Sequence, residues 1–295
     1  MQAMILAAGL GTRLLPHTSI RPKPLFPILN TPLLLLTIER LQNFGFDHIL
    51  VNCHHLREQI VDALNAVEGV VVIEEEIILG TGGGLRGALP HMKDEPILIS
   101  NGDIYHTVNL FELYNYHKIN NHSITLGMHD FTRFNTVSVN GNKVDAFSTD
   151  TKLPTLAFTG LQVVEPDLLK DIEEGEYSCI IDHYRNLLSR GVQIDCFRVD
   201  DCHWTDMGSV DDYLALHEGL LSEKIPCWQE TGIVRKPYCI AKRAQLPVQI
   251  DFEDWVCIGE AKIGNKTHLQ RCVVWDGVVV HGDMVITDTI VSSDQ

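Results

Sequence analysis

A glycine-rich turn that carries one arginine, with one lysine ten residues further on, is the part of this sequence best suited to chemistry. An apolar run leads into Ala7-Ala8-Gly9-Leu10-Gly11-Thr12-Arg13, and Lys23 lies between two prolines. Glycine allows positive φ and lets a ligand approach main-chain N–H groups, so such a turn is suited to bind phosphate oxygens. Arg13 and Lys23 add positive charge for the same phosphates. The spacing therefore predicts a triphosphate-binding site.

Two other phosphate-binding motifs fit this turn poorly. A dinucleotide fingerprint needs a third glycine where this sequence has Leu14, and Pro16 follows soon after. A Walker-type loop needs Gly-Lys-Ser/Thr, and the nearest run, residues 259–267, is interrupted by Asn265. An ordinary β-to-α turn with a surface arginine remains the structural alternative.

The whole pattern Leu-Ala-Ala-Gly-x-Gly-Thr-Arg-Leu-x-Pro at 6–16, followed by Pro-Lys-Pro at 22–24, resembles the signature of the sugar-1-phosphate nucleotidyltransferases, also called nucleotide-sugar pyrophosphorylases. Leu-Gly-Thr-Gly-Gly at 79–83, Phe-Thr-Gly at 158–160 and Trp-Thr-Asp-Met-Gly-Ser at 204–209 resemble further family segments in the same order. Mannose-1-phosphate guanylyltransferases and N-acetylmuramate-1-phosphate uridylyltransferases are the most similar subfamilies.

The resemblance implies a role for each matching position. The catalytic residues would be Arg13, Lys23 and Asp103. The nucleotide-binding residues would be Leu6, Ala8, Gly9, Gly11, Thr12, Glu75, Gly80 and Thr81. The sugar-binding residues would be Asn101, Gly160, Asp182 and Trp204.

The resemblance also implies that two aspartates bind Mg²⁺. Asp103 directly follows the apolar run 97–100, and ligands bind beyond the carboxyl ends of strands in open α/β sheets. Asp206 lies in the Trp-x-Asp-x-Gly segment, and Mg²⁺ takes one or two carboxylates beside phosphate oxygens. A turn or helix cap is the alternative for Asp103 by itself. We expect Asp211 and Asp212 in the first turn of the following helix, where its dipole favours negative charge.

The sequence allows more than one role for three of the sugar-side positions. Gly160 would lie against the sugar or would only bend a strand. Asp182 would be a sugar ligand or a helix cap. Many relatives carry Glu-Lys-Pro before the Phe-x-Gly strand, whereas this chain has Phe147-Ser-Thr-Asp-Thr-Lys-Leu-Pro154. Lys152 is therefore only a candidate for the phosphate contact of the missing lysine.

The reaction implied by the resemblance is attack of a sugar 1-phosphate oxygen on the α-phosphorus of a nucleoside triphosphate, giving a nucleotide-sugar and pyrophosphate. One carboxylate, from Glu75 or Glu76, can accept both donors of a guanine edge, so GTP is favoured and UTP stays open. Two rival functions stay open as well. One is a cytidylyltransferase that acts on a non-sugar phosphate, and the other is a catalytically silent regulatory paralogue.

The amino-acid composition excludes several classes of binding partner and site. Acidic residues outnumber basic residues by 39 to 23, for a formal net charge of −16, which argues against a nucleic-acid partner. The sequence shows no cationic leader with an apolar core and no run of eighteen apolar residues, so we expect a cytoplasmic protein with no membrane contact. Its eight cysteines have no Cys-x-x-Cys spacing, which predicts free, mostly buried thiols. For His54-His55 a structural role is favoured over metal binding.

Short apolar runs that alternate with amphipathic segments predict an α/β fold, a Rossmann-like mixed and mostly parallel sheet flanked by helices. We expect strands at 3–6, 48–52, 70–73, 97–100, 123–128, 158–164 and 193–199, and a hairpin at 137–147. We expect helices at 32–44 (with Thr31 as cap), 56–66, 83–89, 111–118, 166–172, 180–189 and 210–221.

The predicted catalytic domain is 1–222, followed by a linker at 222–236 and a tail at 236–295. In the tail, short Val/Ile–Gly units recur every five or six residues from 256 to 291, which predicts a short hexapeptide-repeat-like left-handed β-helix. A β-meander is the alternative. An apolar coil without a polar cap favours a partner, so we expect a homo-oligomer through the tail.

Overall fold

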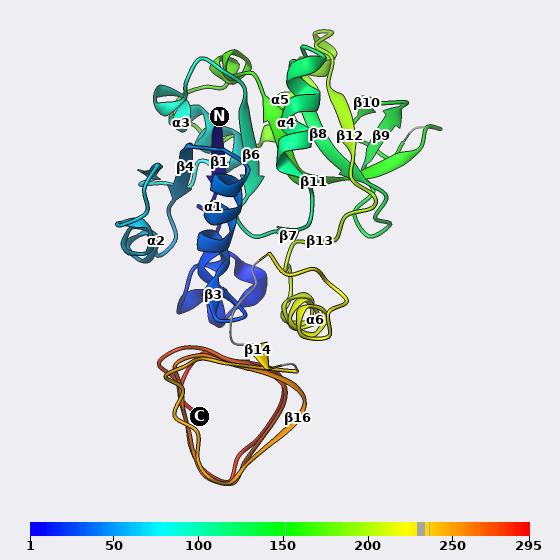
Figure 1. Ribbon diagram of the computed structural model, residues 1–295. Helices are drawn as coiled ribbons and strands as arrows, with labels where there is room; N and C mark the ends of the chain where they lie inside the picture. Colours follow the sequence, from blue (N-terminus) through cyan, green and yellow to red (C-terminus); the bar gives the residue numbers. More distant parts are fainter. Residues whose placement is uncertain (151, 229–233, 236) are drawn as a thin grey trace. The chain divides into compact units, whose positions relative to one another are not determined.

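The computed structural model describes residues 1–150, 152–228, 234–235 and 237–295 (Figure 1). The chain forms two compact units, one of Met1–Leu10 with Thr37–Trp204 and the other of Gly11–Leu36 with Thr205–Gln295. Both units are discontinuous in sequence, because segment 11–36 packs with the C-terminal residues. The predicted domains, 1–222 and 236–295, stay predictions. Residues 229–233 and 236 of the predicted linker lie outside the described residues.

A nine-stranded mixed sheet forms the centre of the first unit, in the order β5-β4-β1-β6-β11-β8-β12-β10-β9. The β5, β4, β1 and β6 strands run parallel to one another, whereas β11 is antiparallel to both β6 and β8. The strands are β1 Gln2–Leu6, β4 His48–Cys53, β5 Val70–Glu74, β6 Ile97–Asn101, β8 Ile124–His129, β9 Val137–Asn140, β10 Lys143–Ala146, β11 Thr155–Val164 and β12 Asp195–Arg198. The predicted α/β class and mixed sheet are confirmed, but the sheet is not mostly parallel, because β11 pairs antiparallel with β6, β8 and β9, and β10 pairs antiparallel with β9 and β12.

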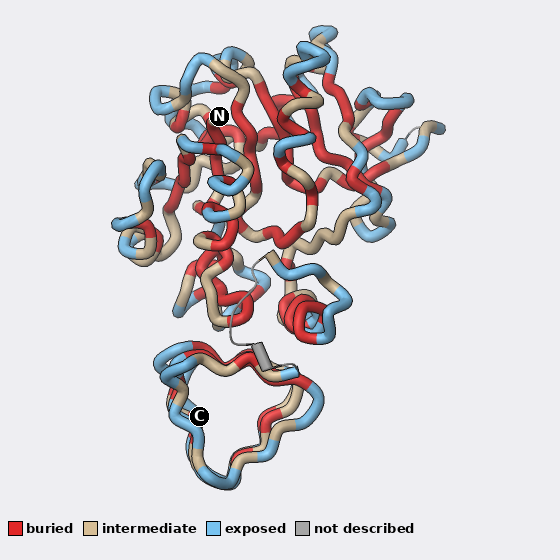
Figure 2. The backbone as a smooth tube through the Cα atoms, viewed as in Figure 1, coloured by how far each residue is buried: buried red, intermediate tan, exposed pale blue. Residues whose placement is uncertain are grey.

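This sheet forms because its central strands are apolar on both faces. Ala3, Met4 and Ile5 of β1 and Leu98 and Ile99 of β6 are fully buried, as is typical of strands covered by helices on both sides. Figure 2 shows these strands in the buried colour. The α-helices of the first unit are α2 Arg57–Leu64, α3 Gly80–Ala88, α4 Leu110–Ile119 and α5 Ile180–Ser189, together with all but the first turn of α1 Leu33–Asn43. The α6 helix, Val210–Leu221, belongs to the second unit, where it contacts strands of the tail.

The α5 and α6 helices have the predicted bounds, and three other helix predictions need correction. The α3 helix begins at Gly80 rather than at residue 83. Thr31 does not cap α1, because Thr31–Pro32 is strand β3, which pairs with β2 Pro27–Ile28. The segment expected as a helix at 166–172 is a 3-10 helix. The 3-10 helices are Thr12–Leu14, His17–Ser19, Lys23–Leu25, Leu89–His91 and Pro166–Asp171.

The tail consists of parallel strands stacked at a nearly regular step. Ile250 pairs with Thr267 and His268 pairs with Val285, a step of 17 residues, and a register shift in β16 shortens the step to 16 between Val256 and Cys272. Parallel pairing rules out the β-meander alternative, and Figure 1 shows the stacked coils end-on with a three-sided outline. The remaining strands are β7 Tyr105–His106, β13 Trp204–Thr205, β14 Val234–Arg235, β15 Tyr238–Ile240, β16 Ile250–Ile258, β17 Lys262–Ile263, β18 Thr267–Val274, β19 Val279–Val280 and β20 Val285–Val291.

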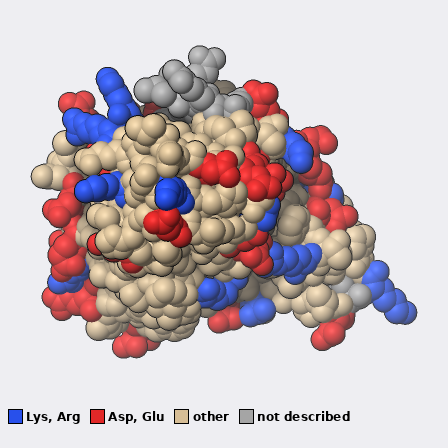
Figure 3. Space-filling model, turned by 90° about the horizontal axis from the view of Figure 1, so that it is seen from below, with Lys and Arg blue, Asp and Glu red and all other residues tan. Residues whose placement is uncertain are grey.

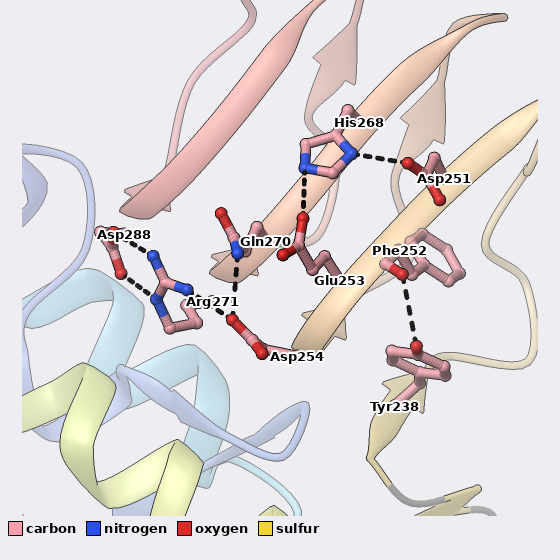
Figure 4. Close-up of polar contacts among 9 residues, drawn as sticks. All are labelled: Tyr238, Asp251, Phe252, Glu253, Asp254, His268, Gln270, Arg271 and Asp288. Atoms are coloured by element: carbon pink, nitrogen blue, oxygen red, sulfur yellow. Dashed lines mark hydrogen bonds and ion pairs between the residues drawn. The ribbon is translucent and has the colours of Figure 1, made fainter.

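Charged side chains follow the same step on the outer face of the tail (Figure 4). Arg271 of β18 forms ion pairs with Asp254 of β16 and Asp288 of β20, and all three residues have positive φ. His268 lies between Asp251 and Glu253, with Nδ1 2.8 Å from the Asp251 carboxylate. Opposite charges in register therefore support the stacking of these coils.

The thiols of the described residues are free and mostly buried, as the cysteine spacing predicts. On the face that Figure 3 shows, acidic and basic side chains lie interspersed. All eight cysteines are free, five are buried, and Cys227 is exposed. Within the described ranges, no helix is long and apolar enough to cross a membrane.

Candidate functional site

The carboxyl ends of three neighbouring strands are joined by hydrogen bonds in the first unit. Leu6 ends β1, and its carbonyl accepts from Gly102 N, just after β6, at 2.9 Å. Ala7 N donates to Asn52 Oδ1, near the end of β4, at 2.9 Å. The first part of the predicted nucleotide loop, Leu6 to Gly9, therefore starts between two strand ends, where open α/β sheets bind ligands.

Glu75 is buried in this network. Its Oε1 accepts from Asn52 Nδ2 at 2.7 Å, and its Oε2 accepts from Leu79 N at 3.4 Å. The Glu75 side chain is 5% exposed. The carboxylate that was expected to read a nucleotide base is thus engaged by Asn52 and the backbone. Sequence reasoning missed Asn52, whose only signal was a polar side chain within an apolar strand.

The glycines at 80–84 have a different place from the predicted one. We expected a glycine loop open to the nucleotide and followed by a helix, but Gly80 to Gly84 form the first turns of α3. Gly82 N and Gly83 N both donate to Ser178 O, so these N-terminal donors already have a protein partner. A Cβ on Gly83 would lie 2.5 Å from Glu176 O. These glycines permit close packing of protein on protein, and the Thr81 hydroxyl accepts from Ile180 N at 3.0 Å.

Three of the four predicted sugar-binding residues are connected by contacts. A Cβ on Gly160, which has φ +79°, would lie 2.5 Å from Asn101 Nδ2. Trp204 Nε1 donates to the carbonyl of Thr159 at 2.8 Å. Gly160 also lies within the register shift of β11 against β8, as the strand-bending alternative predicts. An aromatic group lies around Trp204, formed by His129, Phe131 and Phe134.

The other sugar-side candidates lie apart from this group. Asp182 is exposed in the first turn of α5, and it pairs with Arg185 on the same helix at 2.6 Å. The helix-cap alternative is wrong, because the N-cap residue of α5 is Cys179, and Asp182 lies inside the first turn. Lys152 is exposed beside a residue outside the described ranges. His54 Nδ1 lies 2.9 Å from the carbonyl of Glu75, a structural contact as predicted.

In the second unit the glycine-rich turn brings Arg13 to Asp206. Gly11 has φ +62°, as its predicted role requires, and the 3-10 helix that begins at Thr12 follows it. Arg13 Nη2 lies 3.6 Å from Asp206 Oδ2. Gly208 lies against both groups, since a Cβ there would be 2.7 Å from Arg13 Nη1 and 2.8 Å from Asp206 Oδ2.

Lys23 completes this group from the other side. It is 6% exposed, within the 3-10 helix Lys23–Leu25, and its Nζ donates to the carbonyl of Asp206 at 2.8 Å. Two cations from the N-terminal signature therefore meet one aspartate 180 residues or more away in sequence. Ser209 caps α6 by accepting from Asp212 N, and Asp211 and Asp212 lie in its first turn, as predicted.

The two predicted metal ligands lie in different units. Asp103 follows β6 in the first unit, and Asp206 lies in the second. No group of three or more His, Cys, Asp and Glu side chains in the described parts of the chain could hold a metal ion. Each aspartate supplies carboxylate oxygens, the ligand type that Mg²⁺ prefers, and the Asp206 side chain is 18% exposed.

A mixed α/β sheet with polar loops at its parallel strand ends, and a cationic glycine-rich turn, defines a nucleotide-binding α/β protein. The sequence model of the family described as Nucleotidyl transferase matches residues 2–223, and the chain belongs to this family. It is therefore a nucleotidyltransferase, and the predicted family is confirmed.

Two curated relatives and one solved structure illustrate the similarity. The UTP–glucose-1-phosphate uridylyltransferase of Synechocystis sp. is 28% identical over 97% of this chain and 78% of its own length. The mannose-1-phosphate guanylyltransferase of Mycobacterium tuberculosis is 27% identical over 97% of this chain and 83% of its own length. A putative glucose-1-phosphate thymidylyltransferase from Bacillus anthracis shares the fold, with a TM-score of 0.66 and 18% identity over 77% of this chain and 97% of its own.

Proposed function

We propose that this enzyme transfers a nucleotidyl group from GTP or UTP to a sugar 1-phosphate, releasing pyrophosphate. The observation that carries the proposal is the contact of Arg13 and Lys23 with Asp206, because it joins the two cations of the signature to a predicted metal ligand. The relatives' names support a sugar 1-phosphate as the acceptor, since both name sugar-1-phosphate transferases.

Positioning and charge neutralisation do most of the work in this reaction. The attacking phosphate oxygen is already anionic at neutral pH, so no general base is needed. Arg13, whose side chain is 64% exposed, has the reach to hold the β- and γ-phosphates. Lys23 is buried and oriented by the Asp206 carbonyl, and it bridges the α-phosphate and the incoming sugar phosphate.

Asp103 and Asp206 are the residues that would hold Mg²⁺. When bound, the ion would reduce the repulsion between the phosphates and favour one orientation of the α-phosphate. Asp206 makes two further contacts in this chain. Asp206 holds Arg13 through its side chain and Lys23 through its carbonyl, so it orders both cations before the substrate arrives.

The base and the sugar are specified by the first unit in this proposal. Glu75 and Asn52 are buried and hydrogen-bonded to each other and to the backbone, so they shape the strand ends rather than present free edges to a base. The carboxylate left to accept both donors of a guanine edge is that of Glu76, which is exposed, and on this ground GTP is favoured over UTP. Asn101, Gly160 and Trp204 contact the sugar, with the aromatic side chains around Trp204 as an apolar wall.

A substrate panel tests the proposal. We expect purified protein with Mg²⁺ to release pyrophosphate only when a nucleoside triphosphate and a sugar 1-phosphate are both present. Lys23→Ala and Asp103→Ala are expected to lower kcat by about two orders of magnitude or more while the circular dichroism spectrum stays unchanged. Release with CTP and phosphocholine alone would favour the cytidylyltransferase rival. No turnover with any pair, together with nucleotide-sugar binding, would favour the silent paralogue.

We further propose that the tail is a short left-handed β-helix. Its parallel strands, their step of 16 to 18 residues and the three-sided outline support this (Figure 1). Association of copies through the tail stays a prediction, which light scattering on the purified protein tests. Cytoplasmic location stays a prediction too, and fractionation of cells tests it.

A further inference from the structure

Trp275 of the tail contacts three residues that flank the Pro-Lys-Pro segment at 22–24, namely His17, Arg21 and Phe26. It directly follows β18 and is 1% exposed. The ring of Phe26 meets it edge-on at 4.7 Å between centroids, and the ring of His17 does so at 5.9 Å. The guanidinium carbon of Arg21 lies 4.8 Å from the centre of the Trp275 ring, a cation–π distance. All four residues belong to the second unit.

Two hydrogen bonds fix the same segment on either side of Lys23. His17 Nδ1 lies 2.7 Å from the hydroxyl oxygen of Ser292. Asn30 Nδ2 donates to the carbonyl of Ile258 at 2.9 Å. Residues 17–30 are therefore held against the tail before, at and after the lysine.

These contacts reach Lys23 by a short path. Phe26 N donates to the carbonyl of Lys23 at 3.0 Å, which closes the 3-10 helix Lys23–Leu25. Phe26 thus connects the two residues, because its ring contacts Trp275 and its backbone N–H binds the carbonyl of Lys23. Lys23 then contacts Asp206 through Nζ. A change at Trp275 moves the turn that carries the lysine, and a misplacement of about 1 Å can lower turnover by about 100-fold.

We infer that Trp275 is a positioning residue for Lys23, so that the tail is part of the machinery for nucleotidyl transfer. The inference rests on the proposed function, because it assigns Trp275 a task only if Lys23 acts on the phosphates. Ser292 has the same task through His17, with a single hydrogen bond.

Steady-state kinetics of Trp275→Leu, with both substrates varied, test the inference. We expect kcat to fall by about 10- to 100-fold, with a much smaller change in either KM. Trp275→Phe, which keeps an aromatic ring against Phe26, is expected to recover most of the lost turnover. The matched control is Leu269→Ala, a fully buried tail residue in register with Phe252 and Ile286, which is expected to lower the urea midpoint and leave kcat within about twofold.

A double-mutant cycle separates positioning from general damage. In the Lys23→Ala background, Trp275→Leu is expected to cause no further loss of kcat, because the group that it positions is gone. If Lys23→Ala itself keeps wild-type turnover, the proposed role of Lys23 fails. If Lys23→Ala is slow while folded Trp275→Leu turns over normally, or if the two losses multiply, only the inference fails.

Ser292→Ala keeps the test decisive if Trp275→Leu does not fold. Loss of the hydroxyl is expected to lower kcat by about 3- to 10-fold, the value of one hydrogen bond. Unchanged kcat in Ser292→Ala would then overturn the inference.

Discussion

Gly208→Ala is expected to damage turnover without damaging the fold. Gly208 is not among the residues with positive φ, so its backbone accepts alanine. The added methyl group would lie 2.7 Å from Arg13 Nη1 and 2.8 Å from Asp206 Oδ2, far closer than van der Waals contact. Because the Arg13 side chain is 64% exposed, its guanidinium moves away rather than the backbone. Alanine therefore displaces the cation from the carboxylate.

The magnitude follows from the contacts that are lost. An exposed ion pair contributes at most about 1 kcal/mol, so the melting temperature is expected to fall by no more than about 4 °C. A charge-assisted hydrogen bond from Arg13 to a phosphate is worth about 1.5–3 kcal/mol. Its loss in the transition state lowers kcat/KM by about 10- to 150-fold. Continuous detection of pyrophosphate measures this directly.

Two comparisons decide the outcome. Gly87→Ala is the matched control, because a methyl group there meets only Leu79 Cδ1 at 3.9 Å, and kcat/KM is expected to stay at the wild-type value. In the Arg13→Ala background, Gly208→Ala is expected to lose most of its effect. Wild-type kcat/KM in Gly208→Ala, or an equal loss in both backgrounds, would refute the reasoning.

Three further outcomes are expected. Gly83→Ala places a methyl group 2.5 Å from Glu176 O and is expected to destabilise the fold by about 1–3 kcal/mol in urea titration, against no loss for Gly87→Ala. Gly160→Ala combines φ +79° with a clash against Asn101, so the KM for the sugar phosphate is expected to rise by about tenfold or more while the KM for the nucleotide changes little, as two-substrate kinetics would show. Burial lowers the pKa of His217 from 6.5 to about 4, so the folded protein keeps this ring neutral while the unfolded chain protonates it. The free energy of unfolding is then expected to fall by up to about 3 kcal/mol as the pH decreases from 6.5 to 4, and a melting series in which His217→Gln shows the same decrease would contradict this.

Local patterns predicted the elements whose causes are local. The bounds of α6 follow from the Ser209 cap and the two aspartates in its first turn, both of which are visible in sequence. The central strands follow from apolar runs that are buried on both faces. The pairing of β1 with β4 and β6 follows from their alternation with helices, which places the residues after each strand at one edge of the sheet.

Features that depend on distant partners escaped prediction. Glycine has a low helix propensity, so the run at 80–84 indicated a loop, but the Ser178 carbonyl binds two of its N–H groups and makes it a helix start. Asn52 drew no attention because its partners, Ala7 and Glu75, lie 45 and 23 positions away. Segment 11–36 packs with the C-terminal residues, and no local pattern in the sequence of that segment indicates this packing.

The discontinuity of the second unit has a consequence for the order of events during synthesis. Lys23 and Trp275 are 252 positions apart in the chain. At about 5–20 residues per second, the ribosome adds the tryptophan about 10 to 50 s after the lysine. The first unit can fold during that interval, whereas the signature turn reaches its final support only when the tail emerges. If Trp275 positions Lys23 as inferred, a chain that ends before the tail lacks this support and is expected to turn over slowly.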